Sequence, residues 1–546
     1  MKPSLTIALA GLAAATLAHA DLEPQQGTGR AGGWAPRVAI KPDPAKVVVP
    51  REYKVGVFAA GLDTPSAVAV DGDGNVWVAI SGPLFMQGTE PAHAKVFDKS
   101  GKLVKEIGKG AFTAALDGIG YCPENKKVYV PEHGGRIWEV DGVNGEPRLV
   151  IRDLFIGARR NGAVACRDGY LYFSLGFPSN AGFADPDDHA WVDVPRDPFW
   201  VAHPDGFPPT PHDPVCRDIV HTGLNVRSSD GRLTGALLPA GVPAKKGQVV
   251  KAVVPCGGSI MRVKLADKGA DGVYPHAKME VYAMGFRNQS GVAFGPRGTR
   301  FEGALAVSDN GAADTGNRGI ADSPEKLFLV TEKGQDAGFP DKDGFGFVTG
   351  KRAGRQAWTG SKVDRPYPQL YLGEEPFVPG LPPYRFPVHG QGTRGVPAIV
   401  ANPNPNGYLN PVMQWEPGAA LNGIAWAPAA FGAGKEAVLA AVFGPVEAGP
   451  ESLVPAWPAV VQVDFLNPSG VKWKVFARNA EMGPNAYQKP ENRGGLERTG
   501  GVAFSNDGKT LYVADYGEIF VDAGMPTPYY VTPKSGVVWA ITYTGN

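Results

Sequence analysis

The chain has 546 residues, of which 73 are glycine and 51 are proline, and its charges cancel to a formal net charge of +0. Glycine and proline exceed their usual shares while 43% of the residues are hydrophobic, so the chain is rich in turns and still has enough apolar residues for a large core. No long basic run occurs, so we expect no nucleic-acid partner, because phosphate binding depends on clustered lysine and arginine.

Residues 1–20 have the features of a signal peptide. Lys2 supplies the positive start, residues 5–17 form an apolar run, and Ala18-His19-Ala20 is a small-x-small cleavage site. No later stretch has the ~20 apolar residues that a membrane-spanning helix needs. We therefore expect a periplasmic or secreted protein with no membrane span after cleavage. Residues 21–50 are rich in glycine and proline and are expected to form an extended N-terminal arm.

A repeated pattern fills residues 51–546. Each copy has a small-apolar strand, a polar turn and an apolar-aromatic strand, and the six copies begin at Ser66, Asp117, Asn161, Ser290, Asn422 and Gly500. Six copies of such a unit predict an all-β protein, a six-bladed β-propeller; a solenoid or two β-sandwiches are the alternatives. The C-terminal segment 535–543 resembles a last outer strand, and residues 52–58 are expected to supply the edge that closes the ring.

Two long loop inserts, about 178–260 and 335–415, separate the later copies. The first holds His189, His203, His212 and His221 among several aspartates, which allows a metal site. Prolines interrupt the run and its spacings match no common metal pattern, so we expect a stiff lid over the tunnel mouth instead. The second insert is expected to be a similar lid.

Four cysteines predict one or two disulfides in an oxidising compartment, with three possible pairings. Cys122 and Cys166 occupy the same place in two copies of the repeat. If these copies are neighbours in space, the two cysteines are candidates for one bond. Neither a C-x-x-C pair nor a C-x-x-C-H haem motif is present.

Propeller geometry brings polar residues to one mouth of the central tunnel. The innermost strand of each blade starts there and the second strand ends there, so residues flanking these two ends converge into a default binding site. The residues before the inner strands are Asp117, Arg160, Asn161, Arg287, Asn288, Ser290, Asn422 and Arg498, and those after the second strands are His133, Asp309, Asn310, Asp515 and Tyr516.

Three segments resemble the soluble quinoprotein sugar dehydrogenases, the glucose/sorbosone dehydrogenase family. They are GFRNQSGVAFGP from residue 285, SDNGAADTGNRG from residue 308 with GQDAGFP from residue 334, and LERTGGVAFSNDGKTLYVADYG from residue 496. Together they carry the resemblance loosely over about half of the mature chain. Members of the family are six-bladed propellers that hold pyrroloquinoline quinone (PQQ) and calcium on one face.

The resemblance implies that Arg287 and Asn288 contact the quinone and that Arg498 reaches its carboxylates, since a planar guanidinium pairs bidentately with such groups. Arg160 and Asn161 join these predicted cofactor-binding residues. A calcium ion would lie near four successive residues, because calcium prefers carboxylate and carbonyl oxygens. These predicted metal-binding residues are Asp309, Asn310, Gly311 and Ala312.

The chain departs from the family at two catalytic positions. The family's histidine in an H-x-G-G-R segment is replaced by residues 158–162, ARRNG, and residues 440–444, AAVFG, lack the family's lysine. A neutral imidazole suits removal of a hydroxyl proton near neutral pH. His133 should lie on the same face, so we predict it as a substitute base; the alternative is a turn histidine bonded to the backbone.

These observations predict an exported PQQ-dependent sugar or alcohol dehydrogenase-like oxidoreductase. It would pass hydride from a hydroxyl or aldose carbon to the quinone, and the electrons on to an external acceptor. Two alternatives remain open: a metal-dependent hydrolase of the lactonase type, and a non-catalytic propeller that binds a carbohydrate or a protein.

Overall fold

The computed structural model describes residues 39–545 apart from several gaps. These are 83–85, 88–89, 134, 156–161, 184–212, 228–232, 240, 313–317, 319, 321–322, 349–364, 367–369, 373–374, 377–384, 387–396, 416–417, 435, 445–457, 467–469, 482–490, 492 and 522–528. The predicted signal peptide and most of the predicted arm lie outside the described residues. None of the described helices has the length and apolar character needed to cross a membrane.

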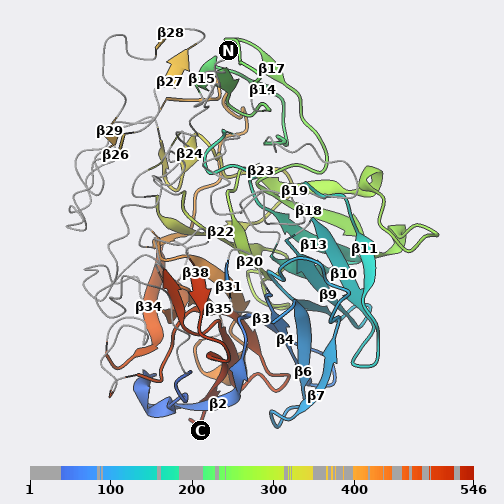
Figure 1. Ribbon diagram of the computed structural model, residues 1–546, viewed down its shortest axis with the longest axis vertical. Coiled ribbons are helices and arrows are strands. Elements are labelled where there is room, and N and C mark those ends of the chain that lie inside the picture. Colours follow the sequence, from blue (N-terminus) through green and yellow to red (C-terminus); the bar gives the residue numbers. More distant parts are fainter. Residues whose placement is uncertain are drawn as a thin grey trace, which may run out of the picture.

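Six antiparallel sheets form the six blades of a β-propeller, which confirms the predicted fold (Figure 1). From the axis outward, blade 1 comprises β3 (Pro65–Val70), β4 (Val76–Ile80), β6 (His93–Phe97) and β7 (Leu103–Ile107). Blade 2 comprises β8 (Gly120–Cys122), β9 (Lys127–Glu132), β10 (Arg136–Val140) and β11 (Arg148–Ile151). Blade 3 comprises β12 (Val164–Arg167), β13 (Tyr170–Leu175), β18 (Ser259–Lys264) and β19 (Glu280–Met284), with β23 (Gln335–Asp336) parallel at the edge.

Blades 4 to 6 follow in the same order. Blade 4 comprises β20 (Gln289–Phe294), β21 (Leu305–Asp309), β22 (Glu325–Val330) and β30 (Met413–Trp415). Blade 5 comprises β31 (Leu421–Trp426), β32 (Ala437–Val442), β33 (Ala459–Leu466), β34 (Gly470–Asn479) and the edge strand β1 (Val47–Val48). Blade 6 comprises β35 (Thr499–Phe504), β36 (Thr510–Asp515), β39 (Gly536–Tyr543) and β2 (Tyr53–Leu62). The described helices are single 3-10 turns: η2 (Pro44–Lys46), η4 (Leu265–Asp267), η5 (His276–Lys278) and η6 (Ala429–Phe431).

The ring closes through the N-terminal strand β2, which pairs with β39. This confirms the prediction that residues 52–58 supply the closing edge. The C-terminal segment is the third strand of blade 6 and not the outermost one, because β2 lies outside it. A second closure was not predicted: β1 adds to the edge of β34, so the N-terminal segment binds both blade 5 and blade 6.

Small residues at the start of the inner strands let neighbouring blades approach closely. A Cβ added at Gly118 would lie 1.6 Å from Gly162 O, and one added at Gly423 would lie 2.8 Å from Gly501 Cα. Equivalent positions of neighbouring repeats therefore touch, which places the starts of the inner strands at one end of the ring. A side chain at either position would force the two blades apart.

Hydroxyl groups join blades at the same end. Ser66 Oγ donates to Leu116 O at 2.7 Å, and Ser308 Oγ donates to Asn422 O at 2.6 Å. Thr499 Oγ1 lies 2.7 Å from Val442 O, to which it donates. The small polar residues of the repeat thus satisfy backbone carbonyls that would otherwise be buried without a donor between blades.

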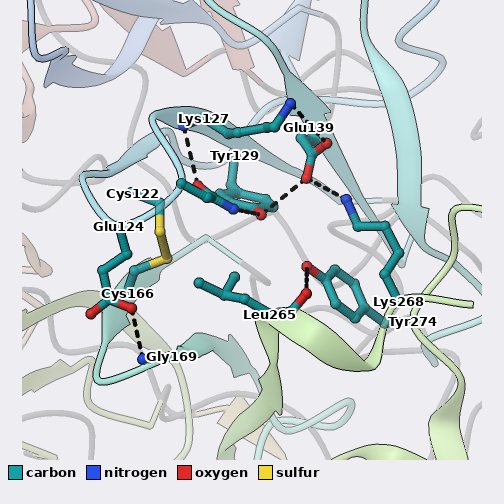
Figure 2. Close-up of a disulfide and its surroundings, with 11 residues drawn as sticks. Cys122, Glu124, Lys127, Tyr129, Glu139, Cys166, Gly169, Leu265, Lys268 and Tyr274 are labelled. Atoms are coloured by element: carbon teal, nitrogen blue, oxygen red, sulfur yellow. Dashed lines mark hydrogen bonds and ion pairs between the residues drawn. A yellow bond between two sulfur atoms is a disulfide. The ribbon is translucent and has the colours of Figure 1, made fainter.

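Both disulfides of the four cysteines form. Cys122 on β8 and Cys166 on β12 are bonded with Cα atoms 5.2 Å apart, so the candidate pairing is confirmed, and the bond joins blades 2 and 3 (Figure 2). In the same view Glu124 accepts a hydrogen bond from Gly169 N at 2.7 Å, a second link between these blades. Cys216 bonds with Cys256, 5.1 Å between Cα atoms.

The described parts of the two inserts pack together into a cap. They share one sheet, whose strands are β16 (Leu233–Gly235), β15 (Leu224–Arg227), β27 (Leu370–Leu372) and β28 (Glu375–Pro376). Figure 1 shows β14 (Ile219–Val220), β15, β17 (Val249–Val250), β27 and β28 gathered at the top, far from β2. The remaining short strands are β24 (Lys342–Asp343), β25 (Gly346–Phe347), β26 (Arg365–Pro366), β29 (Arg385–Phe386), β5 (Met86–Gln87), β37 (Ile519–Val521) and β38 (Tyr529–Val531).

The cap has its own apolar core, and that core includes residues of the propeller mouth. Phe177 follows β13 and Ala312 follows β21, and both belong to the cluster that holds Leu224 and Ile399 of the inserts. Buried Arg318 donates to Ala181 O, Pro340 O and Pro397 O and pairs with Asp341 Oδ1 at 2.7 Å. The inserts are thereby fixed on the mouth side of blades 3 and 4. Three of the histidines considered for a metal site, His189, His203 and His212, lie outside the described residues.

Candidate functional site

Acidic residues at the ends of second strands hold the segments that lead into the inner strands. Asp309 Oδ1 accepts hydrogen bonds from the backbone N–H groups of Arg287 and Asn288 at 2.9 Å and 2.6 Å. In blade 6, Asp515 accepts from Glu497 N at 2.8 Å and Arg498 N at 2.7 Å. The two repeats therefore build the same contact, in which a carboxylate fixes the backbone of a predicted cofactor-binding segment.

Arg287 lies in blade 4, just before β20, and is 4% exposed. Its Nε donates to Asn180 O at 3.0 Å, its Nη2 donates to Asn180 Oδ1 at 2.5 Å, and its Nη1 donates to Gly311 O. The guanidinium thus joins the start of the first insert to the loop after β21. Asn180 was not predicted, because nothing in its local sequence distinguishes it.

Asn288 and Asn310 form a polar network beside Arg287. Asn288 is partly exposed, and its Nδ2 lies 3.3 Å from Asn310 Oδ1, which also accepts from Ser290 Oγ at 2.5 Å. Asn310 Nδ2 in turn donates to Glu325 Oε2 at 3.1 Å. Ala312 N donates to Ser323 Oγ. The structure therefore brings together all six predicted residues of blade 4, and Asn288 is the one with the more accessible side chain.

Two charged residues that the sequence analysis missed lie directly behind this network. Glu325 and Lys326 open β22, and Lys326 Nζ lies 2.7 Å from Asp343 Oδ1 and 3.5 Å from Asp309 Oδ2. Burial works against the charged form of Lys326, but Asp343 and Asp309 outweigh it and raise its pKa. Burial also raises the pKa of Asp309, although Lys326 opposes this. The sequence did contain a signal for these two residues, because two opposite charges stand together at the start of the otherwise apolar strand EKLFLV.

Arg498 lies in blade 6 and is 1% exposed. Its Nη1 donates to Phe443 O at 3.4 Å, and its guanidinium carbon lies 5.6 Å from the centroid of the Phe443 ring. Phe443 follows the second strand of blade 5, so Arg498 links two blades at the mouth. Burial raises the pKa of Asp515, the residue that holds the Arg498 backbone.

His133 lies in blade 2, immediately after β9, and its side chain pairs with Asp117. His133 Nδ1 lies 2.9 Å from Asp117 Oδ2, and both residues are buried. An ionised carboxylate can only accept, so Nδ1 carries a proton and Nε2 is the nitrogen able to take one. The pair joins two members of the predicted mouth set. Arg160 and Asn161 lie outside the described residues; a Cβ added at the neighbouring Gly162 would lie 3.0 Å from Asp117 O.

A small cavity lies between the cap and blade 3, beside the segment that leads to Arg287. It is lined by Phe177, Arg217, Asp336, Tyr408 and neighbouring residues, and has a volume of about 40 Å³. This volume holds one or two water molecules and not a planar organic cofactor. The mouth residues therefore remain the candidate functional site.

No protein-family model and no curated protein matches this sequence. Solved structures do. One is the iodide structure of a Trichoderma reesei carbohydrate-active enzyme of family AA12 (TM-score 0.50, 12% identity, covering 93% of this chain and 100% of that chain). Another is the holo form of the PQQ domain of pyranose dehydrogenase from Coprinopsis cinerea (0.49, 15%, 92% and 98%).

A third is the soluble aldose sugar dehydrogenase of Escherichia coli in its apo form (TM-score 0.45, 13% identity, covering 90% of this chain and 99% of that chain). At such low identities the similarity concerns the fold alone. What the chain does has to be argued from the residues at the mouth.

Proposed function

We propose that this chain is an exported quinoprotein-type oxidoreductase, which oxidises a hydroxyl or aldose carbon of a sugar or related alcohol and passes the electrons to an external acceptor. The observation that carries the proposal is the His133–Asp117 pair. It stands at the same end of the ring as Arg287, Asn288 and Arg498, where the resemblance to sugar dehydrogenases expects a quinone. Export is supported by the predicted signal peptide and by the two disulfides, which persist in oxidising compartments.

The positive charge at the mouth suits a quinone that carries carboxylates, while the guanidinium groups themselves are buried and bond to the chain. Asn288 offers a partly exposed amide, and the guanidinium groups of Arg287 and Arg498 place positive charge at the same end of the ring. These three residues would hold the quinone, and Arg160 and Asn161 are proposed to contribute from blade 3. When bound, the quinone supplies a hydride acceptor.

Calcium fits the predicted set poorly in the arrangement described. Asp309 Oδ1 already accepts two backbone N–H groups, and the Lys326 ammonium lies 3.5 Å from its Oδ2. Gly311 O accepts a hydrogen bond from Arg287. A second cation beside Lys326 would be repelled, so a calcium ion at this place is supported by the resemblance alone.

The chain's own residues supply the acid–base part of the reaction. His133 Nε2 takes the proton of the substrate hydroxyl as the carbon gives up its hydride, and the imidazolium that forms is stabilised by Asp117. The carboxylate also fixes the ring orientation and the tautomer, as in other His–Asp pairs. A general base of this kind contributes on the order of 10²–10⁴ in rate.

One experiment tests this function. The purified chain is incubated with PQQ and Ca²⁺, and reduction of a dye is followed across a panel of sugars and alcohols. We expect turnover that falls at least about 100-fold in His133→Asn, because the base is lost. His276→Asn serves as the matched control, since His276 lies on η5, on the opposite end of blade 3, and bonds Arg152 O at 2.8 Å. Full turnover in His133→Asn would refute the assigned role of His133.

The burial of the two arginine side chains favours a second candidate function, a binding propeller without catalysis. Arg287 and Arg498 both donate to acceptors of the chain itself, as they would in a propeller that binds a carbohydrate or a protein without catalysis. In that case the assay gives neither quinone-dependent absorption nor dye reduction with any substrate. Binding of a sugar without turnover would then identify the mouth as a recognition site.

A further inference from the structure

A cluster of ionisable side chains lies on blade 1, outside the mouth residues described above. His93 begins β6, and its ring is fully buried. Its Nδ1 lies 2.7 Å from Pro91 O, and a carbonyl can only accept, so Nδ1 carries a proton. Burial lowers the pKa of His93, which favours the neutral ring. Nε2 therefore presents a lone pair.

That lone pair faces two carboxylates. His93 Nε2 lies 3.5 Å from Glu90 Oε2 and 3.6 Å from Glu106 Oε1, and no hydrogen-bond donor among the described residues reaches it. A nitrogen lone pair and two anionic oxygens repel one another, and a cation that contacts all three atoms would relieve this repulsion. Strand geometry brings Glu106 to His93. Glu106 on β7 lies opposite Lys95 on β6, and His93, two residues before Lys95, points to the same face of the sheet because side chains alternate along a strand.

The separations match those of a metal centre. The three ligand atoms all lie within 4.8 Å of one another. Two ligands each ~2.1 Å from one ion and at a tetrahedral angle are about 3.4 Å apart, close to the two distances measured from His93 Nε2. In addition, the bond from Nδ1 to a backbone carbonyl is the usual support of a metal-bound histidine, because it fixes the tautomer and the ring orientation.

Two lysines and an aspartate surround the cluster. Lys95 Nζ lies 3.8 Å from Glu90 Oε2 and 3.5 Å from Glu106 Oε1, and Lys109 Nζ lies 2.7 Å from Glu106 Oε2. Lys109 is about half exposed and can swing into solvent when an ion binds. Lys95 is nearly buried, so an ion has to displace its ammonium from both carboxylates. Asp63 is buried; burial raises its pKa, and a hydrogen bond with Glu90 adds to this.

We propose that Glu90, His93 and Glu106 bind one divalent transition-metal ion of the zinc class. One imidazole nitrogen with carboxylate oxygens suits Zn²⁺ or Mn²⁺ better than Ca²⁺, which prefers oxygen ligands throughout. The ion would connect β6 and β7 to the segment that leads into them. This site is distinct from the calcium site that the resemblance implies on blade 4.

Zinc binding by the full chain tests the proposal. The protein is stripped with a chelator, dialysed and titrated with Zn²⁺ by calorimetry, and the metal retained per chain is counted. His93→Asn keeps an amide near Pro91 O and removes the Nε2 ligand, and Glu106→Gln removes one carboxylate. We expect each variant to lose one zinc equivalent, or to bind it at least about tenfold more weakly, and His276→Asn to behave as the wild type.

Two further readouts separate a lost ligand from a lost fold. Zinc should raise the unfolding temperature of the wild type more than that of Glu106→Gln. Without zinc, the two proteins should unfold at similar temperatures. Cobalt should give a visible absorption band in the wild type that His93→Asn lacks. Equal zinc counts and equal affinities in the wild type and both variants would overturn the proposal, as would binding of Ca²⁺ at the same site with the affinity of Zn²⁺.

Discussion

Removal of the Asp515 carboxylate tests how the mouth of the propeller is held together. Asp515 is 1% exposed and accepts hydrogen bonds from three backbone groups and one indole. The donors are Glu497 N at 2.8 Å, Arg498 N at 2.7 Å, Gly517 N at 3.1 Å and Trp539 Nε1 at 3.1 Å. In Asp515→Ala all four donors are left buried without this acceptor.

The magnitude follows from the number of bonds. Each contributes about 1 kcal/mol net, so Asp515→Ala should destabilise the chain by about 4 kcal/mol. The cost of burying the carboxylate is lifted at the same time, which reduces this figure somewhat. In Asp515→Asn one oxygen acceptor survives and about half of the loss, roughly 2 kcal/mol, is expected.

Urea unfolding and hydrogen exchange provide the assay. The urea midpoint should fall in the order wild type, Asp515→Asn, Asp515→Ala. The backbone amides of residues 497, 498 and 517 should lose their protection from exchange first, because they donate directly to the removed carboxylate. Asp141→Ala is the control, since Asp141 is exposed and its carboxylate pairs with Lys127 Nζ at 2.9 Å. If Asp515→Ala unfolds at the wild-type midpoint with unchanged protection at these amides, the account of the mouth is refuted.

Three further outcomes follow from the fold. Replacing Cys122 and Cys166 together by serine should cost about 4 kcal/mol, because the bond closes a loop with a sequence separation of 44; an unchanged urea midpoint under oxidising conditions would contradict this. Gly118→Ala should prevent soluble expression or lower the unfolding temperature sharply, while Gly346→Ala, where an added Cβ meets nothing within 4 Å, should not; similar behaviour of the two would show that the blades are not in close contact. His221 donates to Ala236 O and accepts from Gly223 N, and burial lowers its pKa, so the unfolded chain takes up a proton that the folded chain resists as the pH falls. The stabilisation due to neutral His221 is complete above about pH 6.5, and below that pH it falls by up to about 1.4 kcal/mol per pH unit until the lowered pKa is reached. Thermal unfolding at neutral and mildly acidic pH should therefore depend less on pH in His221→Gln than in the wild type. An equal pH dependence in the two proteins would contradict this role of His221.

The repeat was visible in the sequence because each blade must present the same small inner strand to its neighbour. The glycines of the six copies mark the places where backbones touch, and Cys122 and Cys166 could be paired because equivalent positions of adjacent blades are neighbours. The closing strand was also predictable, since an unpaired edge needs a partner. The repeat unit and its glycines recur at short range, so a local sequence pattern reveals them.

The internal partners of the mouth residues could not be predicted in this way. Asp309 follows Arg287 by 22 residues, and only the folded hairpin brings the carboxylate to the backbone of Arg287 and Asn288. Asn180 reaches Arg287 from the first insert, 107 residues away. Such contacts depend on tertiary structure, and a list of polar residues does not distinguish a ligand from a side chain that holds the backbone.

The polar cluster on blade 1 was missed for a related reason. Glu90 and His93 lie in one segment, but Glu106 joins them only through the pairing of β6 with β7. A search for metal motifs by local spacing does not find a ligand contributed by the next strand.

Equilibrium titration of the purified chain with PQQ tests whether the ring gathers its polar residues into one quinone-binding mouth. Binding is followed by the absorption of the quinone or by quenching of tryptophan fluorescence. We expect one saturable site per chain, weakened at least about tenfold (about 1.4 kcal/mol) in Asn288→Ala and unchanged in Asn406→Ala, an exposed loop position. No saturable binding, or equal binding by the two variants, would contradict it.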